Sequence, residues 1–375
     1  MEKISIQLEE LKMSVCVYID GRPAECREDY REVIGGLGPI PDESQGRFEL
    51  WTNQPCGRAT SQSVWLNPPG SARVKWLADG GAALQSTRVH HGMEDHLLKG
   101  NFSIKVRSAV PTPIMASVLA AFLAHDFPLV DAVMLARAYR GAGWPTSLTD
   151  YPLPLGEPSS RLPFAEFPRF VGLYAVVPTS DWVHRLSRLS VPVVQLRYKD
   201  EAATRHATEV QRAVHAVSGT DTLLFINDHW RLAVECHAYG VHLGQEDVAK
   251  ADLGAIRHAG LRLGISTHCI YEMLCAHACK PSYLALGAIY PTVTKPMRTT
   301  PQGLRRLEHY VRLMSPHYPL VAIGGIDLSR IEAVWSAGVD CAAVLRAIVD
   351  ADDPRRATLD LLATTPRLGC GSDAA

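Results

Sequence analysis

Two aspartates follow two neighbouring apolar runs, LLFI and GVHL, in the second half of the chain. The first run ends at Asn227 and Asp228, and the second, 240–244, ends just before Asp247. The helical pattern between them predicts a strand–helix–strand unit, whose parallel strands end on the same side of a sheet. The two carboxylates should therefore face one space, where they could hold a hard cation such as Mg²⁺. The alternative is that one aspartate caps the following helix and the other is solvated.

The elements that would position these aspartates repeat through the second half of the chain. Eight short apolar runs alternate there with helical patterns, at 171–177, 191–198, 223–228, 240–245, 261–267, 282–289, 318–326 and 341–348. Apolar strands that alternate with helices predict a parallel sheet buried on both faces. Eight such units predict a closed (β/α)₈ barrel, an α/β fold with its active site at the carboxyl ends of the strands. An open doubly wound sheet is the alternative, but no G-x-G-x-x-G turn follows any of the runs.

Seven of the eight runs end in polar or glycine-rich groups. The second run offers Gln195, Arg197 and Lys199 on one face, and a charged pair inside a small barrel needs an anion. The others offer Asn227 and Asp228; Gln245, Glu246 and Asp247; Ser266, Thr267 and His268; Thr292, Thr294 and Lys295; Gly324 and Gly325; and Arg346. Taken singly, each has a structural explanation such as a helix cap or a tight turn. His242 and His268 are more typical of hydrogen-bonded structural histidines than of ligands.

Together these groups predict two anion sites. One would use backbone N–H groups after the seventh and eighth strands, where Gly324 and Gly325 permit close approach of a phosphate. The other would combine Arg197, Lys199 and Lys295 with Mg²⁺ on the two aspartates. Three cations and a metal exceed the need of one monophosphate and suit a diphosphate. The pattern therefore predicts a transfer reaction in which pyrophosphate leaves and its charge is stabilised.

Residues 171 to about 350 closely resemble thiamine phosphate synthase. The matching runs are VVQLRYKD, INDHWRLA, YGVHLGQEDV, LGISTH, YLALGAIYPTVTKP and VAIGGI, in the family's order and spacing. The resemblance implies a (β/α)₈ barrel that joins two small molecules, hydroxymethylpyrimidine diphosphate and thiazole phosphate. The implied products are thiamine phosphate and pyrophosphate, with Mg²⁺ as cofactor. Pyrophosphate would depart first and leave a pyrimidine cation, which the thiazole nitrogen attacks.

The resemblance also implies roles for individual residues. It places Gln195 on the pyrimidine, and Asp228 and Asp247 on Mg²⁺. The diphosphate would be bound by Asn227 and by the candidate catalytic residues Arg197, Lys199, Ser266 and Lys295. Thr292 and Thr294 would line the cleft, and Gly325 with the turn after the eighth strand would hold the thiazole phosphate. Many family members have Ser where this chain has Arg346. An arginine there could add a charge to the thiazole phosphate or point into solvent.

An active synthase has two alternatives among the functions that such a barrel could serve. A thiazole tautomerase shares the barrel, but isomerising one monophosphate needs no diphosphate site. A non-catalytic barrel that binds thiamine precursors would be expected to lose several charged strand-end residues. The retained pair of Arg197 and Lys199, and the two aspartates, count against both alternatives.

The first half of the chain predicts a smaller α+β domain over residues 1–144. A strand is expected at 14–19, and two apolar helices form a predicted hairpin at 113–141, with Asp126 as a cap between them. The hairpin faintly resembles the C-terminal helices of hydroxymethylpyrimidine phosphate kinases. The family's glycine-rich turn is replaced by residues 108–112, so the resemblance implies a degenerate remnant and no kinase activity. Six prolines then interrupt residues 145–169, which predicts a linker before a barrel domain at 170–365.

Composition narrows the class of protein. The 375 residues are 47% hydrophobic and 21% charged with a net charge of −1, which favours a soluble globular protein without nucleic-acid or membrane partners. Nine cysteines without a C-x-x-C pair predict free thiols in a reducing cytoplasm. Cys275, His277 and Cys279 fall in an amphipathic helical pattern, which we favour over a metal site. The oligomeric state stays open, with a homo-oligomer as one option.

Overall fold

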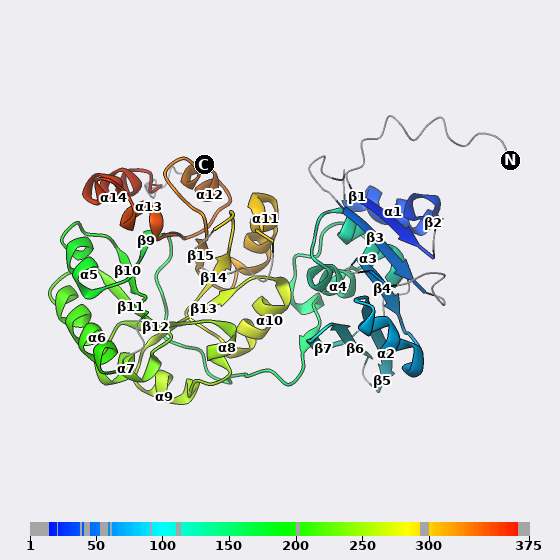
Figure 1. Ribbon diagram of the computed structural model, residues 1–375, viewed down its shortest axis with the longest axis horizontal. Coiled ribbons are helices and arrows are strands. Elements are labelled where there is room, and N and C mark those ends of the chain that lie inside the picture. The colour runs from blue at the N-terminus through cyan, green and yellow to red at the C-terminus, as the bar shows by residue number, and fades with distance from the viewer. Residues whose placement is uncertain are drawn as a thin grey trace, which may run out of the picture. The chain divides into compact units, whose positions relative to one another are not determined.

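The computed structural model describes residues 15–20, 22–37, 40, 46–52, 59–60, 62–90, 92–109, 114–199, 203–292 and 300–366. Contacts divide the chain into two compact units, Met1–Glu157 and Pro158–Ala375 (Figure 1). This division falls inside the Pro-rich segment that we predict as the linker. Within the described residues, no helix is long and apolar enough to cross a membrane.

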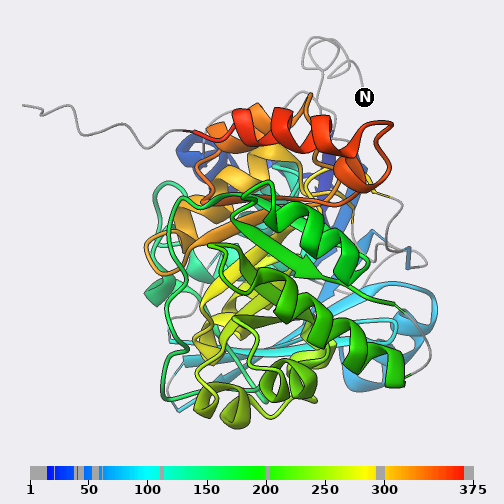
Figure 2. The same cartoon turned by 90° about the vertical axis from the view of Figure 1, so that its left-hand side faces the viewer.

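The second unit is a closed barrel of eight parallel strands, as the eight apolar runs predict. Figure 2 faces the green helices that cover one side of this unit. Each strand pairs with the next in the chain, and the last pairs with the first, with Cys341 opposite Gly172. The strands are β9 (Gly172–Val177), β10 (Val193–Leu196), β11 (Leu223–Asn227), β12 (Gly240–Leu243), β13 (Arg262–Thr267), β14 (Tyr283–Gly287), β15 (Leu320–Ile323) and β16 (Cys341–Val344). The predicted (β/α)₈ fold is confirmed.

Helices connect the strands and cover the outside of the barrel (Figure 1). The longest connection between two barrel strands runs from β14 to β15 and contains the helix Gly303–Met314. One face of this helix packs on the barrel, because its buried residues Leu307, Tyr310, Val311 and Met314 recur at helical spacing. The helices are α5 (Ser180–Ser187), α6 (Ala203–Val217), α7 (Trp230–Glu235), α8 (Gln245–Val248), α9 (Leu253–His258), α10 (Ile270–Cys279), α11 (Gly303–Met314), α12 (Ile331–Ser336), α13 (Arg346–Val349) and α14 (Pro354–Ala363).

Aromatic rings fill the barrel interior toward the amino ends of its strands. Phe167, from the Pro-rich segment, packs against Phe225 and Tyr283, with ring centroids 5.7 and 4.9 Å apart. Gly240 and Gly264 leave room for these rings, because a Cβ at either position would overlap Phe225 or Tyr283 respectively. The end of the Pro-rich segment is therefore part of the barrel core rather than a free connection.

The first unit is built on a sheet in the order β2-β1-β3-β4-β5-β6-β7-β8. β1, β3, β4 and β5 are parallel, and the pairs from β5 to β8 are antiparallel. Its strands are β1 (Val15–Ile19), β2 (Arg22–Pro23), β3 (Gly46–Trp51), β4 (Ser63–Leu66), β5 (Ala82–Val89), β6 (Gly92–Lys99), β7 (Phe102–Ser108) and β8 (Leu153–Pro154). Its helices are η1 (Ala24–Cys26), α1 (Glu28–Leu37), α2 (Gly70–Ala78), α3 (Met115–Ala124), α4 (Leu129–Ala138) and η2 (Leu148–Asp150).

The predicted helical hairpin is formed by α3 and α4. The side chains are buried from Ser117 through Ala124 in α3 and from Asp131 through Ala138 in α4. α3 packs against α1 and β1, which cover the apolar surface that the sequence predicts. An ion pair between Arg137 Nε and Asp95 Oδ2, 2.6 Å apart and fully buried, ties α4 to β6. The predicted cap at Asp126 is wrong, because α4 begins after Pro128 and no side chain caps it.

Candidate active site

Asp228 and Asp247 come from neighbouring strands and interact with each other. Asp228 follows β11 in a left-handed backbone turn with φ 62°, and Asp247 lies in α8, directly after β12. Neither side chain caps a helix: α7 begins after His229 and α8 after Gly244, both without a side-chain cap bond. The helix-cap alternative is therefore wrong for both aspartates.

The electrostatic environments of the two carboxylates differ because Lys199 favours one of them. Lys199 Nζ donates to Asp228 Oδ2 at 2.8 Å. Burial alone would raise the pKa of Asp228, but the hydrogen bond and charge of Lys199 outweigh it and lower that pKa overall. Burial raises the pKa of Asp247, and the charge of Asp228, to which it is hydrogen-bonded, raises it further. The two carboxyls therefore differ in acidity, with Asp228 the more acidic of the pair.

This carboxylate pair fits a hard divalent cation. Within the described ranges, no three His, Cys, Asp or Glu side chains gather as a complete metal site. Mg²⁺ nevertheless takes only one or two protein carboxylates and completes its coordination with water and phosphate. Burial raises the pKa of Asp247 most, and the like charge of Asp228 raises it further; a bound cation would relieve that repulsion.

A chain of hydrogen bonds crosses the barrel interior from β10 to β13. Gln195 Nε2 donates to the Tyr174 hydroxyl at 2.9 Å, and the Tyr174 and Tyr283 hydroxyl oxygens are 2.8 Å apart. The Tyr283 hydroxyl lies 2.7 Å from His242 Nδ1, and His242 Nε2 lies 2.7 Å from Ser266 Oγ. Gln195 and both tyrosines are buried. Burial raises the pKa of each tyrosine, so both phenols stay protonated.

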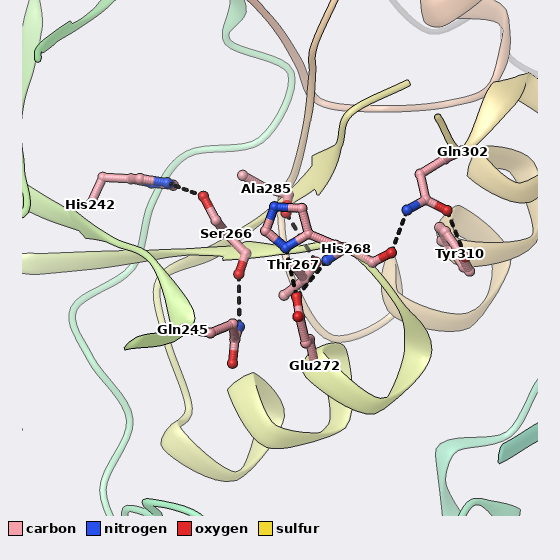
Figure 3. Close-up of polar contacts among 9 residues, drawn as sticks. All are labelled: His242, Gln245, Ser266, Thr267, His268, Glu272, Ala285, Gln302 and Tyr310. Atoms are coloured by element: carbon pink, nitrogen blue, oxygen red, sulfur yellow. Dashed lines mark hydrogen bonds and ion pairs between the residues drawn. The ribbon is translucent and has the colours of Figure 1, made fainter. Parts of the chain in front are cut away.

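Two glutamines hold the backbone where β13 ends (Figure 3). Gln245 Nε2 donates to the Ser266 carbonyl at 2.7 Å, and Gln302 Nε2 donates to the His268 carbonyl. Tyr310 in turn donates its hydroxyl to Gln302 Oε1 at 3.1 Å. These bonds position Ser266 at the carboxyl end of β13, on the same rim of the barrel as Asp228.

The remaining residues predicted for the diphosphate side are placed as follows. Asn227 ends β11 and is buried. Arg197 follows β10, where its backbone N–H donates to the Val177 carbonyl at 2.8 Å and its side chain is partly exposed. Thr292 is described and partly exposed, whereas Thr294 and Lys295 lie outside the described residues.

The opposite part of the rim is built from backbone rather than from charges. Gly324 and Gly325 follow β15 with φ of 104° and 64°, a conformation that favours glycine. A Cβ at Gly325 would come within 2.6 Å of the Pro291 carbonyl oxygen. Arg346 opens α13 after β16, and its Nε lies 2.7 Å from Asp350 Oδ2, with both side chains about half exposed.

Comparisons with known proteins agree on one family. A family model described as thiamine monophosphate synthase matches residues 173–348. Over 200 residues, the chain is 48% identical to the thiamine-phosphate synthase of Pectobacterium atrosepticum, a match that covers 53% of this chain and 94% of that protein. The chain belongs to the thiamine-phosphate synthase family. The Neisseria meningitidis thiamine-phosphate synthase is 52% identical over 181 residues, covering 48% of this chain and 88% of that protein.

The thiamine-phosphate synthase match lies wholly within the barrel unit, so the family predicted from the six motifs is confirmed there. The chain is accordingly a transferase of thiamine biosynthesis. A solved structure of thiamine phosphate pyrophosphorylase from Pyrococcus furiosus aligns over 96% of its length and 52% of this chain, at 26% identity and a TM-score of 0.47.

Sequence reasoning missed several polar groups of this thiamine-phosphate synthase barrel. Tyr174 and Tyr283 lie inside aliphatic runs and therefore resemble ordinary core residues. Their residue type was the available signal, because a buried tyrosine hydroxyl needs a hydrogen-bond partner. Gln302 follows the threonine-rich loop without any distinctive pattern. His242 and His268 are hydrogen-bonded as expected, His242 by both ring nitrogens and His268 by Nδ1 to Glu272 at 2.7 Å.

Proposed function

We propose that the barrel joins hydroxymethylpyrimidine diphosphate to thiazole phosphate, forming thiamine phosphate and releasing pyrophosphate. The observation that carries this proposal is the contact of Lys199 with Asp228 and of Asp228 with Asp247 at adjacent strand ends. An ammonium beside paired carboxylates suits a diphosphate bound through a cation, and such a site is superfluous for isomerising a monophosphate.

In the proposed reaction, the carbon–oxygen bond between the pyrimidine methylene and the diphosphate breaks, and its electrons leave with pyrophosphate. The thiazole nitrogen then supplies the electron pair for the new carbon–nitrogen bond, so no side chain acts as a nucleophile. We propose that Gln195 binds the pyrimidine; that Arg197, Lys199, Asn227, Ser266 and Lys295 bind the diphosphate; that Thr292 and Thr294 line the cleft; and that Gly325 and the turn at Arg346 hold the thiazole phosphate. These groups bind and orient both substrates, which replaces an encounter in solution by a fixed geometry.

We propose Asp228 and Asp247 as the ligands of Mg²⁺. When bound, the cation would neutralise part of the charge that develops on the departing pyrophosphate. Lys199 adds a positive charge at the same place, and Asp228 holds its ammonium there at 2.8 Å. Six cysteines are free thiols, which supports our proposal of a reducing, cytoplasmic compartment: Cys26, Cys236, Cys269, Cys275, Cys279 and Cys341.

Pyrophosphate release tests the proposed function directly. We expect release with Mg²⁺ and both substrates, little release with the diphosphate alone, and none with the thiazole phosphate alone. Chelation of the metal should abolish release. Equal release with and without thiazole phosphate would indicate a hydrolase and would contradict the proposal.

We also propose that the barrel is the complete catalytic unit. The strand count is complete from β9 to β16, and contacts separate the chain before Pro158. A chain that begins at Pro158 should therefore fold and retain synthase activity. A folded, monodisperse but inactive barrel would show that residues before Pro158 take part in catalysis.

A further inference from the structure

The two buried tyrosines connect residues that lie apart in the barrel and that we assign to different parts of one substrate. Gln195 on β10 is assigned to the pyrimidine, and Ser266 on β13 to the diphosphate. Two strands, β11 and β12, separate them in the ring. The hydrogen-bond chain through Tyr174, Tyr283 and His242 is the link between them.

The Gln195 amide sets the direction of this chain. Its Nε2 faces Tyr174, so the Tyr174 oxygen accepts that bond and its own proton must go to Tyr283. The Tyr283 proton then goes to His242 Nδ1, which must lack a proton to accept it. A neutral His242 consequently carries its proton on Nε2 and donates it to Ser266 Oγ.

Other directions are less favourable in this structure. If Tyr283 donated to Tyr174, the Tyr174 oxygen would accept twice, and its own proton would have no partner among the described residues. Leaving a fully buried hydroxyl proton without an acceptor is costly. A complete reversal would need the Gln195 amide turned around, with Oε1 toward Tyr174. It would place the His242 proton on Nδ1, so the two directions predict opposite tautomers.

We propose that Tyr174 and Tyr283 are positioning residues of the synthase, which fix the amide orientation of Gln195 and make the Ser266 hydroxyl a donor to substrate. This inference rests on the proposed function. It adds residues that contact no substrate and act through Gln195 and Ser266.

The two ends of the chain then recognise different chemistry. At Gln195, one amide hydrogen is committed to Tyr174, which leaves Oε1 and one N–H for the pyrimidine edge, where a ring nitrogen can accept. At Ser266, the hydroxyl oxygen already accepts from His242, so its proton points elsewhere. A phosphate oxygen of the diphosphate is a suitable acceptor for it, since hydroxyl bonds to an anion are short and strong.

The His242 tautomer tests the inference without any substrate. The full chain with ¹⁵N-labelled histidine would be studied by long-range NMR near pH 8, above the ordinary histidine pKa of about 6.5. Loss of one signal set in His242→Gln assigns the resonance. We expect a protonated Nε2 and an unprotonated Nδ1, and we expect Tyr283→Phe to abolish that preference. A protonated Nδ1 in the unmodified protein would overturn the inference, as would an unchanged tautomer in Tyr283→Phe.

Steady-state kinetics test the consequence for substrate. Tyr174→Phe keeps the ring and removes only the hydroxyl, so it should raise the KM for the pyrimidine diphosphate about three- to tenfold. The KM for thiazole phosphate should not change. Tyr318→Phe is the matched control, because its hydroxyl also bonds a histidine Nδ1, that of His277 at 2.9 Å, and it belongs to no assigned substrate site. This control should leave both KM values unchanged.

A double-mutant cycle separates positioning from a general packing effect. If Tyr174 acts through Gln195, Tyr174→Phe should have little further effect once Gln195→Ala is present. The same fold-change in both backgrounds would overturn the inference. Failure of the proposed function is distinguishable, because it would appear as no pyrophosphate release in the unmodified protein while the tautomer result still stands.

Discussion

The two halves of the barrel rim offer different groups to the anions that we propose they bind. We define the charged half as Gln195, Arg197, Lys199, Asn227, Asp228, Asp247 and Ser266, and the glycine half as Gly324, Gly325 and the turn at Arg346. The charged half places an ammonium 2.8 Å from a carboxylate and a second carboxylate against the first. The glycine half contributes backbone with positive φ and an arginine paired toward solvent. One half therefore depends on side chains that can be exchanged singly, and the other on backbone shape.

This contrast matches the proposed ligands. A diphosphate bound through a cation needs cationic side chains for its phosphates and carboxylates for the metal ion. These opposite charges lie close together and stabilise one another. A monophosphate can be held by backbone N–H groups, for which close approach matters more than net charge. Substitutions in the two halves should consequently affect different substrates.

The largest expected effect is the loss of the paired aspartates. Asp228→Asn and Asp247→Asn should each reduce turnover about 100-fold or more and raise the Mg²⁺ requirement, because leaving-group stabilisation is lost. The double variant should be little worse than the more damaged single one, since residues acting as a unit are non-additive. Turnover measured against Mg²⁺ concentration checks this. If both single variants kept the normal dependence of turnover on Mg²⁺ concentration, the cation would not bind at these two aspartates.

Stability measurements serve as the control for these variants. Asn tolerates the φ of 62° at Asp228, so Asp228→Asn should lose little beyond a partly exposed ion pair. Asp247→Asn should leave the metal-free melting temperature unchanged or raised, because a repulsion is removed. Since the pKa of Asp247 is raised in the folded protein, any gain should be present above that pKa and vanish as pH falls below the ordinary value of about 3.9.

Lys295→Ala should have the next largest effect, and on the diphosphate alone. Removing a charge-assisted contact should cost about 1.5–3 kcal/mol of diphosphate-substrate binding and slow turnover. Thiazole phosphate binding should hardly change, and Lys295→Arg should restore part of the loss. Calorimetric titration with each substrate checks the assignment. If Lys295→Ala weakened only thiazole phosphate binding, our assignment of the two substrates to the two halves would have to be reversed.

Gly325→Ala should act on the glycine half, with about a tenfold loss of thiazole phosphate affinity. The added Cβ would meet the Pro291 carbonyl oxygen at 2.6 Å, so the loop after β14 must shift. Gly260→Ala is the matched control, because its φ of 73° imposes similar backbone strain with nothing within 4 Å of the Cβ. Affinity measured for both variants separates crowding from strain. Equal affinities would show that the turn holds no phosphate.

The barrel was predictable from sequence because its strands are mostly apolar runs whose charged residues lie at or just beyond their ends. Charged groups such as Asp228 and Lys199 are expensive inside a core, so their recurrence at strand ends indicated a site. The sheet of the first unit was largely missed because its strands mix both kinds of residue. β6, for example, carries Glu94, Asp95 and His96 in its middle. Asp95 is nevertheless buried, because Arg137 from α4 and the Ser86 hydroxyl both donate hydrogen bonds to its carboxylate.

The hydrogen bonds between residues of the site could not be predicted in the same way. A tyrosine within a run such as that of β14 fits a core position whether or not its hydroxyl has a partner. Tyr174 and Tyr283 lie on strands that are far apart in the chain, and only the fold brings their hydroxyl oxygens to 2.8 Å. Likewise, spacing placed Lys199 and Asp228 on one rim but did not indicate that they contact each other.

The smallest expected effect concerns Arg346, the departure from the family pattern. Its guanidinium is 2.7 Å from Asp350 four residues on, both groups are about half exposed, and such surface pairs contribute little. Arg346→Ser should therefore change thiazole phosphate affinity by less than about threefold, because backbone donors of the turn are retained. Arg356→Ser is the matched control, since Arg356 pairs with Asp360 on α14 at the same spacing, away from the rim. If only Arg346→Ser weakens thiazole phosphate binding tenfold or more, and the loss shrinks in high salt, Arg346 leaves Asp350 to bind the phosphate and the glycine half is charged after all.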